Sequence, residues 1–186
     1  MRLYIGLVHY PVYNKNHEII ASAITPVDLH DIARSAKTYG VKKFFVITPL
    51  DDQQGLAEQV RRHWTEGYGA RYNRHRKEAI ELVSVVPSLK GAIEEITEIE
   101  GKHPLVIATD ASKHRDRVIS YESARVLILE ERGVILLFGT AWGLDKAVMK
   151  GADYILAPIL GKGGYNHLSV RTAAAIILDR LVGDFA

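Results

Sequence analysis

Short apolar runs alternate with segments of helical period along the chain. Six of these runs are nearly continuous in Val, Ile, Leu and Phe, as expected of parallel strands that are covered on both faces. They are Leu3–Val8, Phe44–Ile47, Leu82–Val86, Leu105–Ala108, Val134–Phe138 and Tyr154–Leu156. The pattern therefore predicts a buried parallel sheet.

Helical segments lie between and after these runs. Asp28–Tyr39 carries Ile32, Ala36 and Tyr39 on one stripe and stops at Gly40, a residue that often follows a helix. The other predicted helices are Leu89–Ile99, Tyr121–Arg132 and Leu168–Val182. Alternation of strands with helices predicts an α/β fold in which helices flank the sheet on both faces.

The chain shows no linker, repeat or low-complexity segment, so we expect one domain spanning residues 1–186. Tyr10–Pro26 is the exception to the regular pattern, because it has no clear period. Loops of that length are usually functional or mobile. The alternative is a surface excursion that packs on a partner subunit.

Composition excludes several classes of protein. The chain has no cysteine, which excludes disulfides, thiolate metal sites and cysteine nucleophiles and fits a reducing compartment. The apolar run at Met1–Val8 is too brief for a signal peptide, and no run reaches the roughly 18 residues that span a bilayer. We therefore expect a soluble, cytoplasmic protein. A net charge of +2 does not by itself indicate nucleic-acid binding.

Ligands of open parallel sheets collect at the carboxyl ends of the strands. The first predicted strand is followed by His9-Tyr10-Pro11, without the glycine fingerprint of a nicotinamide-binding enzyme. Gly161-Lys162-Gly163-Gly164 lacks the spacing and the Lys-Ser/Thr ending of a P-loop. Neither of these nucleotide-binding classes is therefore indicated.

The last three predicted strands each end in a turn that suits a ligand. These turns are Thr109-Asp110-Ala111, Gly139–Gly143 and Pro158–Ser169. Glycine permits positive φ and lets a ligand approach the backbone, while Thr140 and Ser169 add hydroxyls. We expect a ligand held largely by main-chain groups, such as a nucleobase edge or an amino-acid moiety. The alternative is that these are ordinary turns and helix caps.

The C-terminal half carries a resemblance to a known family. Phe138–Leu144 reads FGTAWGL and is followed by Tyr154–Ile159 and Tyr165–Ala175. These segments resemble the two C-terminal motifs of the knotted SPOUT methyltransferases, which bind S-adenosylmethionine and modify RNA. The whole chain resembles a small single-domain bacterial family of that class, beginning at Leu7–Lys15 and continuing through His30–Val41.

The resemblance implies several properties that periodicity does not show. It implies a deep trefoil knot in the C-terminal part of the sheet and a homodimer with the Asp28–Tyr39 helix and the last helix near its interface. It implies S-adenosylmethionine as cofactor and no required metal. Together with the strand-end turns, it predicts a set of cofactor-binding residues: Thr109, Asp110, Leu137, Phe138, Gly139, Thr140, Gly143, Leu144, Ala157, Pro158, Ile159, Gly164, Tyr165, Asn166, His167, Leu168 and Ser169.

The resemblance also proposes residues for the methyl acceptor. Arg34 matches an arginine that positions or activates the ribose 2′-hydroxyl in ribose-methylating relatives, although a helix-borne arginine is also a common salt-bridge partner. Those relatives have asparagine six residues earlier, where this chain has Asp28, so a base nitrogen is the other possible acceptor. Asn166 is a further catalytic candidate. His167 is either catalytic or a cap of the last helix, and Asp110 is either a ligand residue or a turn residue.

The most polarised stretch of the chain is basic and aromatic. It contains Trp64, Tyr68 and Tyr72 and the predicted RNA-binding residues Arg61, Arg62, Arg71, Arg74, Arg76 and Lys77. Arginine forks and aromatic faces suit looped or single-stranded RNA, while a solvated helix face is the plainer explanation.

We therefore expect a methyltransferase that acts on tRNA or rRNA. The first alternative is an RNA-binding or regulatory module that binds the cofactor without catalysis, because a fold does not fix a function. The second is a nucleotide-dependent metabolic enzyme.

Overall fold

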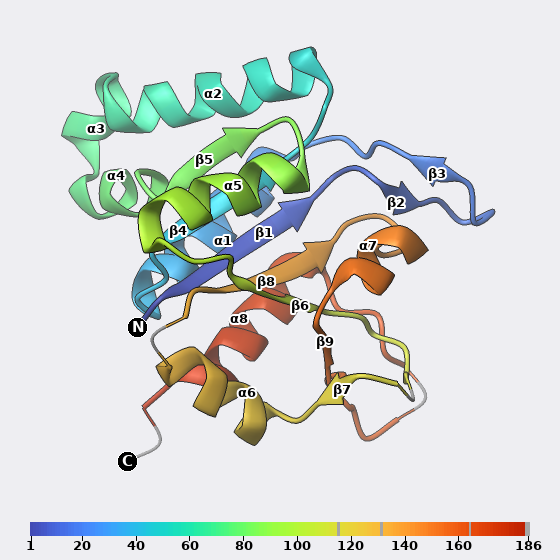
Figure 1. Ribbon diagram of the computed structural model, residues 1–186. Helices are drawn as coiled ribbons and strands as arrows, with labels where there is room; N and C mark the ends of the chain where they lie inside the picture. The colour runs from blue at the N-terminus through green and yellow to red at the C-terminus, as the bar shows by residue number, and fades with distance from the viewer. Residues whose placement is uncertain (115, 131, 164, 185–186) are drawn as a thin grey trace.

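A computed structural model describes residues 1–114, 116–130, 132–163 and 165–184 of the chain. Its centre is a sheet of seven strands in the order β5-β4-β1-β8-β6-β9-β7, in which every neighbouring pair is parallel (Figure 1). The strands are β1 Leu3–Val8, β4 Lys43–Ile47, β5 Val83–Val86, β6 Leu105–Ala108, β7 Val118–Ile119, β8 Val134–Gly139 and β9 Tyr154–Leu156.

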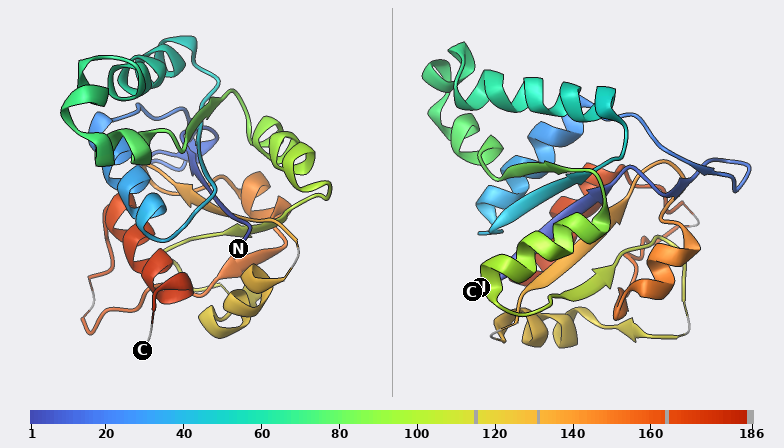
Figure 2. Two further views of the ribbon diagram at one scale, coloured as in Figure 1. Left: turned by 90° about the vertical axis from the view of Figure 1, so that its left-hand side faces the viewer. Right: turned by 45° about the horizontal axis from the view of Figure 1, so that its top comes forward.

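Helices cover both faces of the sheet, as Figure 2 shows. They are α1 Pro26–Thr38, α2 Asp51–Thr65, α3 Tyr68–Tyr72, α4 Arg74–Ile80, α5 Leu89–Glu100, α6 Tyr121–Leu129, α7 Lys146–Gly151 and α8 Val170–Val182. The α/β class and the helices on both faces confirm the prediction from sequence.

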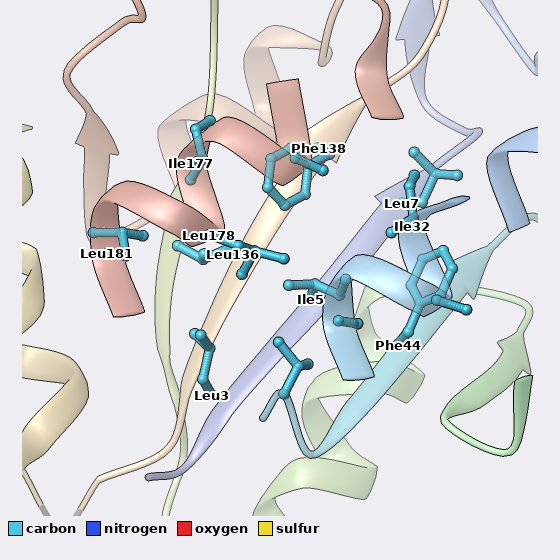
Figure 3. Close-up of a cluster of buried hydrophobic side chains, with 14 of the residues drawn as sticks. Leu3, Ile5, Leu7, Ile32, Phe44, Leu136, Phe138, Ile177, Leu178 and Leu181 are labelled. Carbon is cyan, nitrogen blue, oxygen red and sulfur yellow. The ribbon is translucent and has the colours of Figure 1, made fainter. Parts of the chain in front are cut away.

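The two faces divide the buried side chains of each strand between them. Leu3, Ile5 and Leu7 of β1 join one cluster with α1, α4, α6 and α8, while Tyr4 and Val8 join a second with α5 and α7. Figure 3 shows the first cluster, where side chains of α1 and α8 meet those of β1, β4 and β8. Because side chains of a strand alternate between its faces, a strand buried on both sides is apolar at every position.

The six predicted strands are all present, with bounds that agree within one residue. The prediction for Tyr121–Arg132 was wrong at its end, because α6 stops at Leu129 and Glu130 is extended, with ψ of 167°. The helix predicted over Asp28–Tyr39 begins earlier, at Pro26, and proline suits a first helical position because its missing N–H would have no helical partner.

Several elements were not predicted. Helix α2 has a narrow apolar stripe, at Leu56, Ala57, Val60 and Trp64, of which only Ala57 is buried, and α3, α4 and α7 are each shorter than eight residues. Tyr10–Pro26 is not structureless, because it contains the hairpin strands β2 Val12–Tyr13 and β3 Ile19–Ile20. Within the described residues, no helix is long and apolar enough to cross a membrane.

Candidate cofactor site and RNA surface

The three glycine-bearing or polar turns meet at one edge of the sheet. Strands β8, β6 and β9 are neighbours, with Ala108 opposite both Leu137 and Ile155. All three strands run in the same direction, so the turns that follow them gather at their carboxyl ends. The predicted sharing of one site by three strand ends is therefore possible in this topology.

The turn after β8 leaves no room for side chains at its first glycine. A Cβ on Gly139 would lie 2.7 Å from the Leu144 backbone nitrogen and 3.0 Å from the Gly143 carbonyl carbon. Gly143 has a φ of +102° and Ala141 a φ of 51°, both in the region that side chains disfavour. The backbone here is tightly folded, and the glycine at position 139 is required by the closure of the turn on Gly143 and Leu144.

The β2–β3 hairpin holds this turn in place. The Tyr13 amide donates to the Gly143 carbonyl at 3.0 Å, and the Trp142 amide donates to the Tyr13 carbonyl at 2.9 Å. The Tyr13 hydroxyl donates to Oδ2 of Asp145 at 2.8 Å. Burial opposes the charged form of Asp145, but hydrogen bonds from Tyr13 and from backbone amides at the start of α7 outweigh it and lower its pKa. The hairpin therefore stabilises the conformation of the turn.

A buried histidine joins the same region from the end of β1. Nδ1 of His9 lies 2.9 Å from Oγ of Ser22, which lies 2.5 Å from Oγ1 of Thr140. The Thr140 hydroxyl donates to the Val8 carbonyl at 3.0 Å, so it accepts from Ser22, and Ser22 in turn accepts from the Nδ1 proton. Nε2 then carries no proton, and within the described residues it has no hydrogen-bond partner. Burial lowers the pKa of His9 to about 4, against the opposing charge of Asp28.

Polar residues of the turns after β6 and β9 form hydrogen bonds within the chain. The Thr109 hydroxyl donates to the Leu137 carbonyl at 2.8 Å. The Asp110 carboxylate lies 2.6 Å from Nε2 of His114, and Nδ2 of Asn166 donates to the Ala111 carbonyl at 2.9 Å. Of the predicted ligand residues, Asn166 thus joins the turn after β9 to the turn after β6, whereas Thr109 ties its turn to β8 and Asp110 pairs within its own turn.

The segment before α8 is the more exposed side of the site. Ser169 is the N-cap of α8, so His167 does not cap the helix and instead lies edge-on to Tyr165. Gly164 lies outside the described residues. Large apolar side chains remain open to solvent around the turns: Trp142 is 64% exposed, Leu160 61%, Tyr165 75% and Leu168 44%.

Both carboxylate oxygens of Asp28 accept hydrogen bonds within the chain. Its Oδ2 accepts from the Thr25 hydroxyl at 2.7 Å, and its Oδ1 accepts from Nη1 of Arg171 at 3.0 Å. Nε of Arg171 also lies 3.6 Å from the Asp31 carboxylate. The pair ties the first turn of α1 to the first turn of α8. Sequence reasoning missed Arg171, although it stands within the quoted C-terminal motif.

Arg34 lies on the same helix but serves none of these contacts. Its exposed side chain lines a shallow hollow of about 380 Å³ that extends between α1 and α8 to Tyr39 and Ala175. Its guanidinium makes no hydrogen bond or ion pair with the described residues. The structure thus brings Asp28 to Arg171 and leaves the Arg34 side chain exposed.

The basic and aromatic stretch between Arg61 and Lys77 forms the candidate RNA surface, here called the basic segment. Some of its cations pair with carboxylates of the described residues and others do not. Arg61, Arg74 and Lys77 pair with Glu58, Glu78 and Glu81, at 2.9, 3.1 and 3.8 Å. The guanidinium of Arg76 lies 4.5 Å from the Trp64 ring centre. Arg62 and Arg71 are exposed and form no ion pair with the described residues. An exposed pair such as Arg74–Glu78 contributes little to stability, so its arginine is readily available to a phosphate.

We predict that Gly139→Ala weakens cofactor binding by roughly 5-fold to 150-fold, the equivalent of about 1–3 kcal/mol of overpacking. The added Cβ must displace the Leu144 amide and so deform the turn. Calorimetry with S-adenosylmethionine measures the effect. Gly55→Ala is the matched control, because a Cβ there meets nothing within 4 Å in mid-α2. Equal affinity of the two variants would contradict the prediction.

Comparison with known proteins agrees with this geometry. A family described as SAM-dependent RNA methyltransferase matches residues 2–183. A curated protein of Oleidesulfovibrio alaskensis, named tRNA (guanine-N(1)-)-methyltransferase, is 47% identical over 182 residues, which are 98% of this chain and 42% of that protein. The chain therefore spans less than half the length of this relative, and more than half of the relative lies outside the match.

Solved structures show the same fold at low identity. TrmJ from Z. mobilis superimposes with a TM-score of 0.65 at 15% identity, covering 99% of this chain and 69% of that one. The SpoU methyltransferase AviRb from Streptomyces viridochromogenes, solved in complex with AdoMet, gives a TM-score of 0.57 at 19% identity, covering 97% of this chain and 56% of that one.

Proposed function

This chain belongs to the SAM-dependent RNA methyltransferase family of the SPOUT superfamily, and from that premise we propose that it methylates tRNA or rRNA. The observation that carries the proposal is the tight glycine turn after β8, set beside the turns after β6 and β9. We place the reaction in the cytoplasm, the compartment that fits the absence of cysteine.

The RNA class is supported by the curated relative, whose name specifies tRNA and N1 of guanine. That name describes a protein more than twice as long as the matched part, so the guanine specificity belongs either to this part or to the remainder. We therefore propose tRNA as the first RNA to test and rRNA as the second, with the acceptor atom left to the experiment.

The cofactor is S-adenosylmethionine, which supplies a methyl group made reactive by its sulfonium. The turn at Gly139 supports this proposal, because its glycine lets the backbone of Gly139–Leu144 fold tightly at the carboxyl end of β8. We propose that Leu137–Leu144 and Ala157–Ser169 hold it mainly through main-chain groups. The exposed apolar rings of Trp142 and Tyr165, which belong to these two segments, would exclude water from a bound cofactor.

We propose that Arg34 contacts the RNA at the methyl acceptor. Holding donor and acceptor in line is the main requirement of such a displacement, and a guanidinium fork positions a hydroxyl or a phosphate well. Asp28 acts through Arg171 and positions α8 against α1, because both of its carboxylate oxygens already have partners. Asn166 acts similarly by holding the turn after β9 to Ala111.

We propose that the chain is a homodimer built on α1 and α8 and that its C-terminal part is knotted. Exposed Val27 and Arg34 on α1, together with the hollow that reaches Ala175 of α8, support an interface there. The knot is proposed from the family resemblance, and the path of the chain is compatible with it, since the chain passes from β9, between β6 and β7, back to α8, which packs against α1 and β8.

We propose that the basic segment, comprising Arg61, Arg62, Arg71, Arg74, Arg76 and Lys77, binds the RNA backbone. Affinity should then fall as salt rises, with a slope of log Kd against log salt of roughly 0.7 per phosphate contact on single strands. Fluorescence anisotropy with labelled RNA measures the slope, and Arg71→Ala and Arg74→Ala should each reduce it. Affinity that ignores both salt and these substitutions would exclude the basic segment.

Tritium transfer tests the proposal as a whole. Labelled S-adenosylmethionine is incubated with the protein and with tRNA or rRNA from cells that lack it, and mass spectrometry of the digested product identifies the atom. The Asp28 carboxylate is already bound to Arg171, so it is not free to accept a proton from the RNA. This favours a second candidate function, a module that binds cofactor and RNA without catalysis. Tight cofactor binding with no incorporation into either RNA would support that module.

A further inference from the structure

Two exposed tyrosines form a stacked pair on the short helix α3. The ring centres of Tyr68 and Tyr72 are 5.9 Å apart with an interplanar angle of 22°, and the residues are 73% and 74% exposed. They stand four positions apart, so they share one face of the helix. Neither ring contributes to the buried core, so this pair is an apolar surface available for binding.

Helix α3, which carries the pair, packs against Trp64. Gly69 of α3 is buried against Trp64, and a Cβ there would lie 2.6 Å from Cε3 of the indole. The indole is fixed in turn by the Arg76 guanidinium at 4.5 Å and by the ring edges of His63 and His30 at 5.1 and 5.4 Å. Trp64 is thus a structural anchor, and the two tyrosines are the free aromatic faces of the segment.

Cations flank the tyrosines. Arg71 lies between them in sequence, is exposed and pairs with no carboxylate among the described residues. Arg74 opens α4, and its pair with Glu78 is highly exposed, with an arginine side chain that is 87% accessible. Aromatic faces next to exchangeable guanidinium groups are complementary to a polyanion with unstacked bases.

The pair lies away from the proposed cofactor site. In Figure 1 and in the right panel of Figure 2, α3 is beyond the end of α2, at the opposite end of the molecule from the β2–β3 hairpin that braces the Gly139 turn. A ligand that reaches both places in one protomer must be long. An RNA of the proposed substrate class satisfies this requirement.

We propose that Tyr68 and Tyr72 stack an unpaired base of the RNA substrate at a distance from the methylated nucleotide, while Arg71 and Arg74 hold the adjoining phosphates. This inference rests on the proposed RNA function and adds a specific requirement, an unpaired nucleotide in the region that contacts α3. Any of the four bases can stack on an aromatic ring face. The tyrosine pair should therefore recognise that a nucleotide is unpaired, and not which base it carries.

The test compares two labelled RNA probes, a hairpin with a seven-nucleotide loop and a blunt duplex of equal length. Tyr68→Ala with Tyr72→Ala should weaken hairpin binding by roughly 5-fold to 100-fold and duplex binding by less than about twofold. The slope of log Kd against log salt should stay constant. The matched Tyr68→Phe with Tyr72→Phe control keeps both rings and should bind like the wild type.

Arginine variants separate stacking from charge. Arg71→Ala and Arg74→Ala should lower the salt slope by roughly 0.7 each for single-stranded contacts, unlike the tyrosine variants. Gly69→Ala should weaken hairpin binding with all four side chains present, because the added Cβ pushes α3 off Trp64. Thermal melts should show native stability for the tyrosine variants, whose rings lie outside the core.

Several results would overturn the inference. Alanine variants that bind the hairpin like the wild type would exclude stacking, and a phenylalanine control that loses as much as alanine would assign the effect to the hydroxyls. A change of oligomeric state by light scattering, with RNA affinity kept, would assign the pair to a protein interface. A wild-type protein that binds neither probe and methylates no RNA would defeat the proposed function itself, a distinct outcome.

Discussion

Lowering the pH from 7 to 4 should reduce the free energy of unfolding by about 3 kcal/mol through His9 alone. Burial lowers the pKa of this histidine to about 4 from its ordinary value of 6.5. Between these two pH values the His9 imidazole is protonated in the unfolded chain and neutral in the folded protein. Stability therefore falls as the pH falls through this window. Each pKa unit corresponds to about 1.4 kcal/mol of unfolding free energy. The destabilisation by His9 therefore grows as the pH falls below 6.5 and levels off below about pH 4.

The measurement is urea unfolding at a series of pH values on the wild type and on His9→Asn. Asparagine can supply a polar atom near the Nδ1 position, which faces Ser22, but does not titrate. The difference between the two pH profiles removes the carboxylates and the other histidines, which titrate in both proteins. Parallel profiles between pH 7 and pH 4 would show that His9 is not responsible.

The strands were predictable because burial on both faces leaves a direct mark on the sequence. Every residue of β1 is buried, from Leu3 to Val8, so the run is apolar without interruption. Helix α2 leaves a weaker mark, a narrow stripe of Leu56, Ala57, Val60 and Trp64 on which only Ala57 is buried. Its position follows from contacts with α3, α4 and β5 that no local pattern encodes.

The residues of the candidate site likewise divide into those that local sequence reveals and those that only the fold brings together. The glycines of the Gly139 turn were found from sequence because a tight turn restricts residue type locally. The partner of Asp28 was not found, since Arg171 is 143 positions away and is brought near only by packing of α8 on α1. The link from His9 to Thr140 depends likewise on β1 and β8 being neighbours.

The aromatic residues of the basic segment show what three dimensions add. In sequence, Trp64, Tyr68 and Tyr72 are equivalent candidates for stacking with bases. In the fold, Trp64 is covered by Arg76 and by the backbone at Gly69, whereas both tyrosines are open. Exposure, which depends on tertiary contacts, therefore decides between a structural anchor and a binding surface.

Replacing Arg34 with alanine should lower the rate of methyl transfer by roughly a hundredfold to a thousandfold, the range for losing one well-placed polar group at a reacting centre. The residue is exposed and pairs with no described carboxylate, so the change should leave stability within about 0.5 kcal/mol of the wild type. Affinity for S-adenosylmethionine, measured by calorimetry, should change by less than about twofold, because Arg34 lies on α1 and not on the glycine turns.

Two variants sharpen the Arg34 experiment. Lys37→Ala removes an exposed cation from the same helix and should leave the rate unchanged, which controls for net charge. Arg34→Lys keeps the charge but loses the planar fork, so an intermediate rate would indicate that the fork positions the acceptor. Single-turnover tritium transfer at saturating cofactor isolates the chemical step from binding. An Arg34→Ala protein that turns over like the Lys37→Ala control would remove Arg34 from the reacting centre and would restrict the hollow between α1 and α8 to subunit contact.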